Sequence, residues 1–406
     1  MTERVVIVGA GQAGGRLAAI LRKQGWEGGI TLLGDEFDPP YERPPLSKEV
    51  LADDADPLVG RLFPDTFYQE QEIDLLLARS AASLDPVAKR IQVGHENLDY
   101  GTLVLATGAR ARRLACEGAD LPGIFLLRNT EDARGLRPRL QPGAHVVLIG
   151  GGFIGLEVAA SARKRGCMVT VLEAQPQLLG RVADPAVAEV IQNLHRAKGV
   201  EIRCGAQLEA FEGHGRLQAV RLTDGTRIPA EIAVVGIGAV PNQELAVAAG
   251  IDCDNGIVVD AATRTSAPDV LAIGDVTAQS HAWLGARVRL ESWENAELQA
   301  QAAANTILGR PAAAVGAPWF WTDQFDLNLQ ILGGRCPHDR VVSRGNPADG
   351  PWCHFFLKDE RIVTACLGNA GRERRAVKQL MDSRAPVEPA ALADPGTSLR
   401  SLVPKA

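Results

Sequence analysis

VVIVGAGQAG at residues 5–14 and VVLIGGGFIG at residues 146–155 are two copies of one pattern, an apolar strand that runs into G-x-G-x-x-G. In this fingerprint the first glycine makes a tight turn and the second lets the backbone approach a pyrophosphate. The third lets the following helix pack against the strand, and the N-terminus of that helix faces the anion. Two copies on one chain predict two bound dinucleotides between which electrons are exchanged.

The residues that follow each fingerprint strengthen this prediction. Each glycine pattern opens a helical stretch that ends in a basic cluster and a glycine, and a second strand-like run comes next. The first run ends in Asp35 and the second in Glu173. An acid about 20 residues past the glycines binds an adenosine ribose through its hydroxyls. We therefore expect two Rossmann-like βαβ units.

Length and composition limit the possible classes of protein. A chain of 406 residues is long enough for two or three domains, and 46% apolar with 23% charged residues is an ordinary globular balance. The chain has no apolar run near the ~18 residues that span a bilayer. Its first strand begins by Val5, which leaves no room for a signal peptide. We expect a cytoplasmic protein without a membrane partner, and the net charge of −6 argues against nucleic acid.

Cysteine and histidine give no sign of a metal or a redox dithiol. The seven cysteines include no C-x-x-C, and the seven histidines include no pair at a helical metal-ligand spacing. We therefore predict that no metal is bound. Basic clusters at residues 110–113 and 372–375 are either docking patches for an acidic protein or solvated faces.

The order of the segments predicts an α/β protein with two Rossmann-like dinucleotide-binding domains and a C-terminal α+β domain. The first domain comprises residues 1–110 and 239–315, the second residues 111–238, and the third residues 316–406. Two further buried strands of the first domain end in Thr107-Gly108 and Gly274-Asp275, at the sheet edge where ligands bind in open α/β folds.

Local patterns predict the remaining elements. A helix rich in alanine and glutamine is expected over 295–308 and a short helix over 374–382. Strands are expected at 327–332 and 354–357. We expect the Pro- and Ala-rich tail to be poorly ordered at its end.

With these features in place, the chain resembles the two-dinucleotide flavoproteins of glutathione reductase-like fold. The segment PYERPPLSK at 40–48 narrows the resemblance to the FAD-dependent ferredoxin reductases of bacterial ring-hydroxylating dioxygenases and class I cytochrome P450 systems. LRNTEDA at 127–133, ESWEN at 291–295 and PWFWTDQ at 318–324 are similar to other stretches of that family. The resemblance covers nearly the whole chain.

The resemblance implies an FAD site. Its residues would be Gly9, Gly11, Ala13, Gly14, Asp35, Arg43, Lys48, Ala82, Thr107, Gly108, Arg128, Gly274, Asp275 and Trp293. Among them, Asp35 would bind the adenosine ribose, Asp275 the ribityl chain, and Arg43 and Lys48 the flavin nucleotide. Trp293 replaces a smaller residue of some family members.

Three residues are implied to act in catalysis. The resemblance pairs Lys48 with Glu157 beneath the isoalloxazine, where a cation near N5 favours the reduced flavin. It also places Trp321 in an aromatic wall over the flavin. Other roles remain open, because Lys48 as a surface residue, Glu157 as a helix-dipole acid and Trp321 as a core aromatic would fit the same positions.

The second fingerprint predicts the nicotinamide cofactor. Glu173 repels a 2′-phosphate, and the residues immediately after it include no arginine, which favours NADH over NADPH. Arg181 lies too far along the sequence to bind a 2′-phosphate of NADPH, unless the loop folds back and brings it to the end of this strand. The predicted NAD site comprises Gly150, Gly152, Ile154, Gly155, Glu157, Glu173, Arg181 and Gly238.

The resemblance implies an NADH:ferredoxin oxidoreductase in which electrons pass from NADH through FAD to a 2Fe–2S ferredoxin. That ferredoxin would feed a terminal oxygenase, with an aromatic-ring dioxygenase preferred to a P450. Reduction of a P450 ferredoxin or of a rubredoxin, and an NADH-sensing flavoprotein like apoptosis-inducing factor, are the alternatives. A disulfide reductase or peroxidase of this fold needs a redox cysteine shortly after the first βαβ unit. The first cysteine of this chain is Cys116, which argues against both classes.

Overall fold

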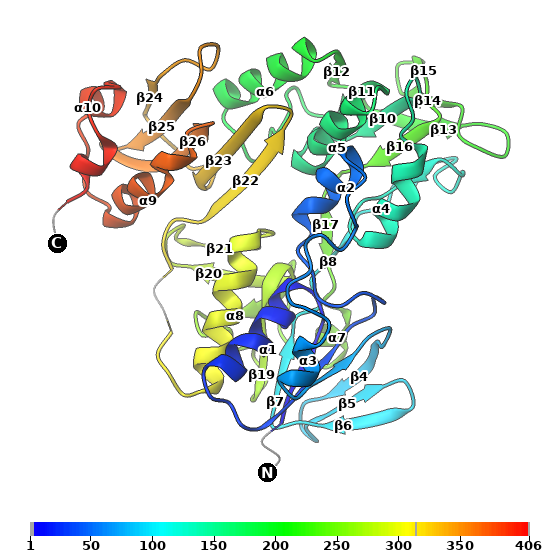
Figure 1. The fold of residues 1–406 in the computed structure, drawn as a ribbon, viewed down its shortest axis with the longest axis vertical. Coiled ribbons are helices and arrows are strands. Elements are labelled where there is room, and N and C mark those ends of the chain that lie inside the picture. Colours follow the sequence, from blue (N-terminus) through cyan, green and yellow to red (C-terminus); the bar gives the residue numbers. More distant parts are fainter. Residues whose placement is uncertain (1–3, 313–314, 405–406) are drawn as a thin grey trace. The chain divides into compact units, whose positions relative to one another are not determined.

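The computed structural model describes residues 4–312 and 315–404, which form two compact units (Figure 1). Unit 1 contains the described residues of 1–43, 58–110 and 239–315, and unit 2 those of 44–57, 111–238 and 316–406. Residues 44–57, predicted with the first domain, thus pack in unit 2. The division of unit 2 into a domain of residues 111–238 and another of residues 316–406 stays a prediction, because both segments belong to that one unit.

A five-stranded parallel sheet in the order β19-β7-β1-β2-β3 forms the centre of unit 1. Its strands are β1 (Arg4–Val8), β2 (Gly29–Leu33), β3 (Ile73–Leu76), β7 (Thr102–Leu105) and β19 (Val270–Ala272). Helices α1 (Gln12–Lys23) and α8 (Trp293–Ile307) pack side by side on one face.

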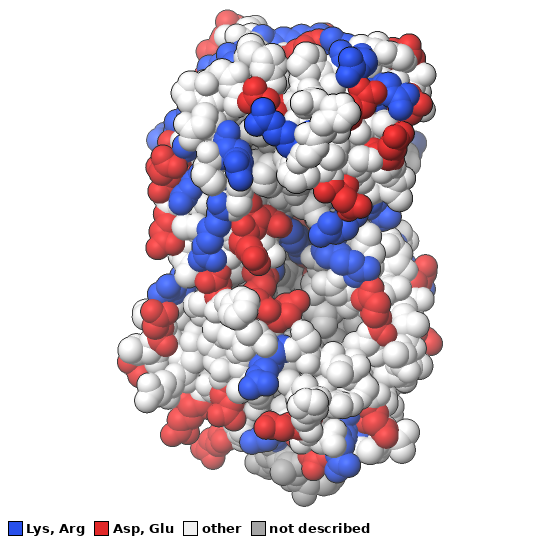
Figure 2. Space-filling view, turned by 90° about the vertical axis from the view of Figure 1, so that its right-hand side faces the viewer, with Lys and Arg blue, Asp and Glu red and all other residues white. Residues whose placement is uncertain are grey.

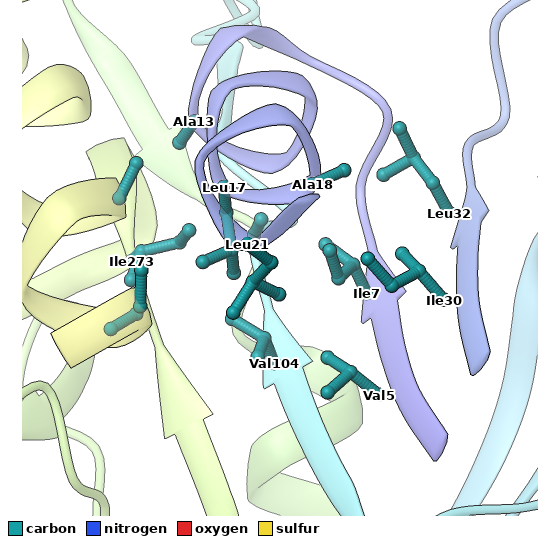
Figure 3. Packing of buried hydrophobic residues seen from close by; sticks show 14 of the residues in the cluster. Val5, Ile7, Ala13, Leu17, Ala18, Leu21, Ile30, Leu32, Val104 and Ile273 are labelled. Carbon is teal, nitrogen blue, oxygen red and sulfur yellow. The ribbon is translucent and has the colours of Figure 1, made fainter. Parts of the chain in front are cut away.

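The core under these helices follows from strand and helix periodicity. Val5 and Ile7 point toward Leu17 and Leu21 of α1, and all four side chains are fully buried (Figure 3). Val6 and Val8, between them in sequence, belong to the core on the other face of the sheet. Because the strands are covered on both faces, they read as continuous apolar runs.

Smaller elements complete unit 1. They are α3 (Phe67–Glu70), β4 (Ala81–Asp85), β5 (Arg90–Val93), β6 (Glu96–Asp99), β17 (Ala239–Pro241), α7 (Glu244–Ala248), β18 (Ile257–Val259), η3 (Gly274–Val276), β20 (Thr277–His281) and β21 (Ala286–Val288). Helix α8 begins two residues before the predicted start, at Trp293, because the Ser292 hydroxyl caps it by accepting the Asn295 N–H.

Unit 2 contains a second parallel sheet in the order β12-β11-β10-β16-β9. Its strands are β9 (Ile124–Phe125), β10 (His145–Ile149), β11 (Met168–Glu173), β12 (Val200–Cys204) and β16 (Ile232–Val235). The associated elements are η1 (Pro44–Ser47), α2 (Glu49–Ala52), α4 (Thr130–Leu136), η2 (Arg137–Arg139), α5 (Phe153–Lys164), α6 (Pro185–Ala197), β13 (Leu208–Glu212), β14 (Ala219–Leu222) and β15 (Arg227–Pro229). The short strand β8 (Ala109–Ala111) begins in unit 1 and ends in unit 2.

An antiparallel sheet in the order β22-β23-β26-β25-β24 completes unit 2. Its elements are β22 (Trp319–Gln324), β23 (Leu327–Gly333), β24 (Arg340–Arg344), β25 (Trp352–Lys358), β26 (Arg361–Gly368), η4 (Gly371–Glu373), α9 (Arg374–Ser383), α10 (Pro389–Ala393) and η5 (Leu399–Leu402). The strands and the helix predicted here are confirmed, with shifted ends.

The Pro- and Ala-rich tail is packed as far as residue 404, and poor order was predicted only for its end. Leu392 and Leu399 are fully buried, and the Arg344 guanidinium donates to the carbonyls of Asp394 at 2.6 Å and Thr397 at 2.8 Å. Composition could not show this, because buried leucines and one arginine hold the segment. Residues 405–406 lie outside the described range.

Candidate functional site

The first fingerprint forms an open cradle at the N-terminus of α1. A methyl group added at Gly9, whose φ is +120°, would lie 2.1 Å from the Ala106 carbonyl oxygen, and one at Gly14 would lie 2.1 Å from the Gly9 oxygen. At Gly11 it would meet nothing within 4 Å. The first and third glycines are therefore required by packing, whereas the second leaves free space in front of a helix N-terminus.

The second fingerprint repeats this geometry at the N-terminus of α5. Methyl groups added at Gly150 and Gly155 would lie 2.5 Å from the Gly236 oxygen and 2.4 Å from the Gly150 oxygen. At Gly152 the nearest atom would be 4.0 Å away. Each unit thus offers backbone N–H groups and space for one pyrophosphate.

Two neighbouring acids follow the strand beside the first cradle, and the role of Asp35 toward the adenosine ribose stays a prediction. Asp35 is exposed, while its neighbour Glu36 accepts hydrogen bonds from Tyr41 at 2.5 Å and Arg43 at 2.6 Å. Although burial opposes the charge of Arg43, the pKa of its guanidinium is raised, because Tyr41, Glu36 and Asp275 favour that charge. Asp275 therefore lies near enough to Arg43 for the two predicted FAD residues to interact.

Other predicted residues of unit 1 reach the same sheet edge. Gly274, with φ +80°, lies against Ala13 of the cradle, where an added methyl group would be 3.1 Å from the alanine methyl. The Thr107 hydroxyl donates to the Asn242 carbonyl at 2.7 Å, which fixes the turn through Gly108. Ala82 is exposed on β4, and Trp293 is half-buried at the start of α8.

In unit 2, Glu173 is held against the second cradle. Its carboxylate accepts the N–H of Gly151 at 2.7 Å and that of Gln175 at 2.8 Å. The following loop returns Arg181 to the same edge, where its guanidinium would lie 3.5 Å from a methyl group added at Gly238. Ile154, 45% exposed, leaves an apolar side chain beside the cradle.

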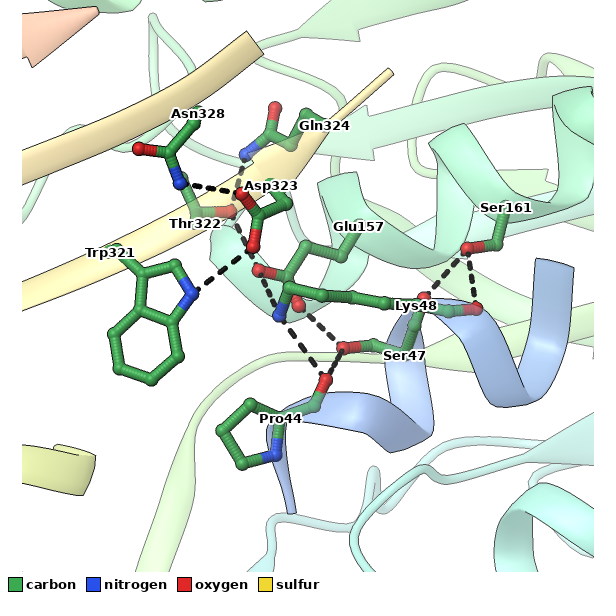
Figure 4. Close-up of polar contacts among 10 residues, drawn as sticks. All are labelled: Pro44, Ser47, Lys48, Glu157, Ser161, Trp321, Thr322, Asp323, Gln324 and Asn328. Atoms are coloured by element: carbon green, nitrogen blue, oxygen red, sulfur yellow. Dashed lines mark hydrogen bonds and ion pairs between the residues drawn. The ribbon is translucent and has the colours of Figure 1, made fainter. Parts of the chain in front are cut away.

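Lys48 and Glu157 form a nearly buried ion pair (Figure 4). Their Nζ and Oε1 atoms are 2.9 Å apart, and the two side chains are 16% and 6% exposed. Lys48 also donates to the Pro44 carbonyl at 3.2 Å. The structure therefore excludes the readings of Lys48 as a surface lysine and of Glu157 as an acid that serves only the helix dipole.

Sequence reasoning gave no role to the hydroxyls around this pair. Ser47 donates to Glu157 Oε2, and Thr322 donates to Glu157 Oε1 at 2.7 Å. Ser161 donates to the Ser47 carbonyl at 2.7 Å and so fixes the turn before Lys48. Ser47 and Thr322 lie within two of the segments that carried the family resemblance, which was the available signal.

Trp321 lies on the opposite face of β22 from Thr322, as strand alternation requires (Figure 4). Its Nε1 donates to Asp323 at 3.1 Å, and its ring stacks on Trp319 with centroids 5.1 Å apart. The Arg374 guanidinium lies 4.2 Å from the Trp319 ring centroid. Part of the basic cluster at 372–375 therefore supports this aromatic stack.

Arg128, a predicted FAD residue, lies in unit 2 just before α4. Its backbone N–H donates to Asp132 at 2.7 Å within the capping box formed by Asn129 and Asp132. The position of its guanidinium relative to the first cradle stays a prediction.

Six of the seven thiols are poorly suited to act as nucleophiles. All seven cysteines are unpaired. Burial raises the pKa of the Cys353 thiol to about 12. It raises those of Cys116, Cys167, Cys204, Cys253 and Cys366 as well. Because the thiolate is the reactive form, these residues offer little support for sulfur redox chemistry.

Other features concern metals, membranes and surface charge. Among residues 4–312 and 315–404, no group of three or more His, Cys, Asp or Glu side chains is placed to hold a metal ion. No helix in these ranges has the length and apolarity to cross a bilayer. Acidic and basic side chains are interspersed on the face drawn in Figure 2.

Comparisons with known proteins extend these observations. Residues 3–300 match the family model described as pyridine nucleotide-disulphide oxidoreductase, and residues 319–403 match one described as reductase C-terminal. The chain is 41% identical to a probable ferredoxin reductase of Castellaniella defragrans, over 98% of each chain.

Two further comparisons name redox partners of similar proteins. The chain is 40% identical to the ferredoxin–NAD(+) reductase component of the biphenyl dioxygenase system of Paraburkholderia xenovorans, over 99% of each chain. Its structure is similar to one in the covalent putidaredoxin reductase–putidaredoxin complex. The TM-score is 0.96 at 38% identity, covering 99% of this chain and 98% of that chain.

Proposed function

Because the chain belongs to the pyridine nucleotide-disulphide oxidoreductase family and continues into a reductase C-terminal domain, we propose that it is an FAD-dependent NADH:ferredoxin reductase. One structural observation carries the proposal, namely the two glycine cradles that each leave their second glycine open. The reductases of known systems that it resembles over almost its full length support a 2Fe–2S ferredoxin as acceptor.

The residues present fit both dinucleotides. Gly9, Gly11, Ala13 and Gly14 would hold FAD, with Arg43 and Asp275 beside them. Gly150, Gly152 and Gly155 would hold NADH, with Glu173 toward its adenosine ribose. When bound, FAD supplies the exchange between a two-electron donor and a one-electron acceptor.

The side chains of the protein would then position the two cofactors and tune the reactivity of the flavin. Glu157 holds the Lys48 ammonium in place, and Ser47 and Thr322 hold Glu157. Lys48 would present its positive charge to the flavin, and Trp321 with Trp319 would provide an aromatic surface. The redox step requires no thiol of this chain. We place it in an oxygenase system, with an aromatic-ring dioxygenase preferred. The cytoplasmic location stays a prediction.

The test is an activity assay on the FAD-loaded protein. NADH oxidation is followed with ferricyanide and with a 2Fe–2S ferredoxin of a ring-hydroxylating dioxygenase, and a P450 ferredoxin and a rubredoxin are compared as acceptors. We expect turnover with ferricyanide and a preference for a 2Fe–2S acceptor. A flavin-loaded protein that binds NADH but reduces none of these would instead favour the NADH-sensing alternative.

A further inference from the structure

A chain of hydrogen bonds extends from Glu157 into the interior of unit 2, and its first part is drawn in Figure 4. The Thr322 hydroxyl donates to Glu157 Oε1 at 2.7 Å, and Gln324 Nε2 donates to Thr322 Oγ1 at 3.1 Å. Gln324 Oε1 lies 2.8 Å from His195 Nε2, in the last turn of α6. Four residues from α5, β22 and α6 are thereby connected.

Every member of this chain is withdrawn from solvent. Glu157 is 5% exposed, Thr322 1%, and Gln324 and His195 0%. Thr322 and Gln324 are two residues apart on β22, so strand alternation directs both toward the same side. Because water is excluded from these groups, the hydrogen bonds that they make are to other groups of the protein.

The carboxylate at one end fixes the direction of every bond. Glu157 beside Lys48 can only accept, so the single Thr322 proton points to it, and the Thr322 oxygen then accepts from the Gln324 amide nitrogen. The Gln324 oxygen consequently faces His195, which must carry its proton on Nε2.

The surroundings of His195 agree with this assignment. Burial lowers the pKa of its imidazole, which favours the neutral ring. Its Nδ1 is buried and has no hydrogen-bond partner among the described residues, so a proton there would be a buried donor without an acceptor, which favours the proton on Nε2. The chain therefore has one direction, from His195 to Glu157.

We propose that Thr322, Gln324 and His195 are positioning residues that hold the Glu157 carboxylate, and through it the Lys48 ammonium, in one orientation. The inference rests on the proposed function, in which Lys48 faces the flavin. Ser47 holds the other carboxylate oxygen, so removal of Thr322 frees only the oxygen that contacts Lys48. The effect should appear at the flavin before it appears in cofactor binding.

The principal test compares Thr322→Val, which removes the hydroxyl, with Thr322→Ser, which keeps it. Thr364→Val is the matched control, because Thr364 is a buried threonine of the same sheet whose hydroxyl bonds to the Gly334 carbonyl. We expect Thr322→Val to slow flavin reduction by NADH about tenfold, as for loss of a hydrogen bond to a charged group. FAD retention and KM for NADH should change little, and Thr322→Ser should restore most of the rate.

Two further readouts distinguish positioning from stability alone. The midpoint potential of bound FAD should shift in Thr322→Val and not in Thr364→Val. Nitrogen-15 NMR should show the Nε2–H tautomer of His195 in the wild type. Because the Gln324 amide can turn once Thr322 no longer directs it, the population of the Nδ1–H tautomer should increase in Thr322→Val.

A second pair keeps the inference testable if Thr322→Val does not fold. His195→Phe removes the donor and should slow flavin reduction, while His195→Gln supplies an amide N–H and should resemble the wild type. An active wild type whose Thr322→Val or His195→Phe variant matches it in rate, potential and tautomer would overturn the inference. A wild type that shows the Nε2–H tautomer but transfers no electrons from NADH would overturn the proposed function instead.

Discussion

The two fingerprints share three glycines, yet the helices that they open carry opposite charges at the same position. Two residues after the third glycine lies Arg16 in α1 and Glu157 in α5. Arg16, 26% exposed, pairs with Glu42 at 3.0 Å and Glu297 at 2.8 Å. Glu157 is buried and pairs with Lys48. The glycines therefore make equivalent cradles, and this later position gives only the second helix a buried ion pair.

The ends of the second strands differ as well. The first glycine of each fingerprint donates its N–H to the equivalent strand residue, Leu33 at 2.7 Å in unit 1 and Leu172 at 2.8 Å in unit 2. The next residue is Gly34 in unit 1 and Glu173 in unit 2. The acids predicted for the same role, Asp35 and Glu173, therefore occupy different structural positions.

The neighbouring residue accounts for this difference. A methyl group added at Gly34 would lie 2.6 Å from the methyl group of Ala10, so a side chain has no room there. In unit 2 the equivalent of Ala10 is Gly151, which leaves space for the Glu173 carboxylate and donates its N–H to it. The difference between Ala10 and Gly151 therefore decides whether the residue directly after the second strand can be an acid.

The largest expected effect tests whether the cradles are equivalent. Gly9→Ala should lower the free energy of unfolding by roughly 3 kcal/mol or more, because of strain at positive φ and the clash with Ala106. Gly11→Ala should leave stability almost unchanged and abolish FAD retention, since only the ligand approaches there. Thermal unfolding of the apoprotein and absorbance of the reconstituted protein measure both effects.

The same pair in unit 2 completes that test. Gly150→Ala should lower the free energy of unfolding. Gly152→Ala should raise KM for NADH without loss of bound flavin. If Gly11→Ala and Gly152→Ala affected the same cofactor, the assignment of one dinucleotide to each cradle would be wrong.

The next effect tests the opposite charges. Lys48→Met should cost about 3 kcal/mol, because it leaves the buried Glu157 without its ionic partner. It should also slow flavin reduction more than it weakens FAD binding. Arg16→Met should cost less than about 1 kcal/mol, because its ion pairs are partly exposed. Denaturant unfolding and stopped-flow reduction by NADH would show equal effects if the two positions were equivalent.

A smaller effect separates the two acids. Glu173→Ala should raise KM for NADH roughly tenfold, the size of a lost hydrogen bond to a charged group, and should relax discrimination against NADPH. Asp35→Ala should leave KM for NADH unchanged and lower FAD retention. Steady-state kinetics with both nicotinamides measure this, and unchanged selectivity in Glu173→Ala would remove the NADH assignment.

The smallest effect concerns the histidine in the chain behind Glu157. Burial lowers the pKa of His195 below its ordinary 6.5, so as pH falls the unfolded chain binds a proton that the folded chain does not. Stability should therefore decline on acidification. As the pH falls through the ordinary histidine pKa of about 6.5, the wild type should lose more stability than His195→Gln. Parallel losses in denaturant titrations would contradict the shift.

Much of the fold followed from local sequence. Apolar runs such as 5–8 and 146–149, each followed directly by the glycine fingerprint, predict strands covered on both faces, and these glycines predict the turns that the structure shows. The resemblance in PYERPPLSK also led to Lys48 and its partner Glu157. These predictions depended on residues near one another or on a specific motif.

The tertiary structure decided what contacts between distant residues control. The family resemblance covered the segment that holds Thr322 and Gln324, but it did not identify either of them, or His195, as a partner of Glu157. Only folding brings β22, α6 and α5 together. The tail likewise depends on Arg344, some 50 residues earlier. Sequence determined which local conformations the backbone could adopt, and tertiary packing determined which buried polar groups had to satisfy one another.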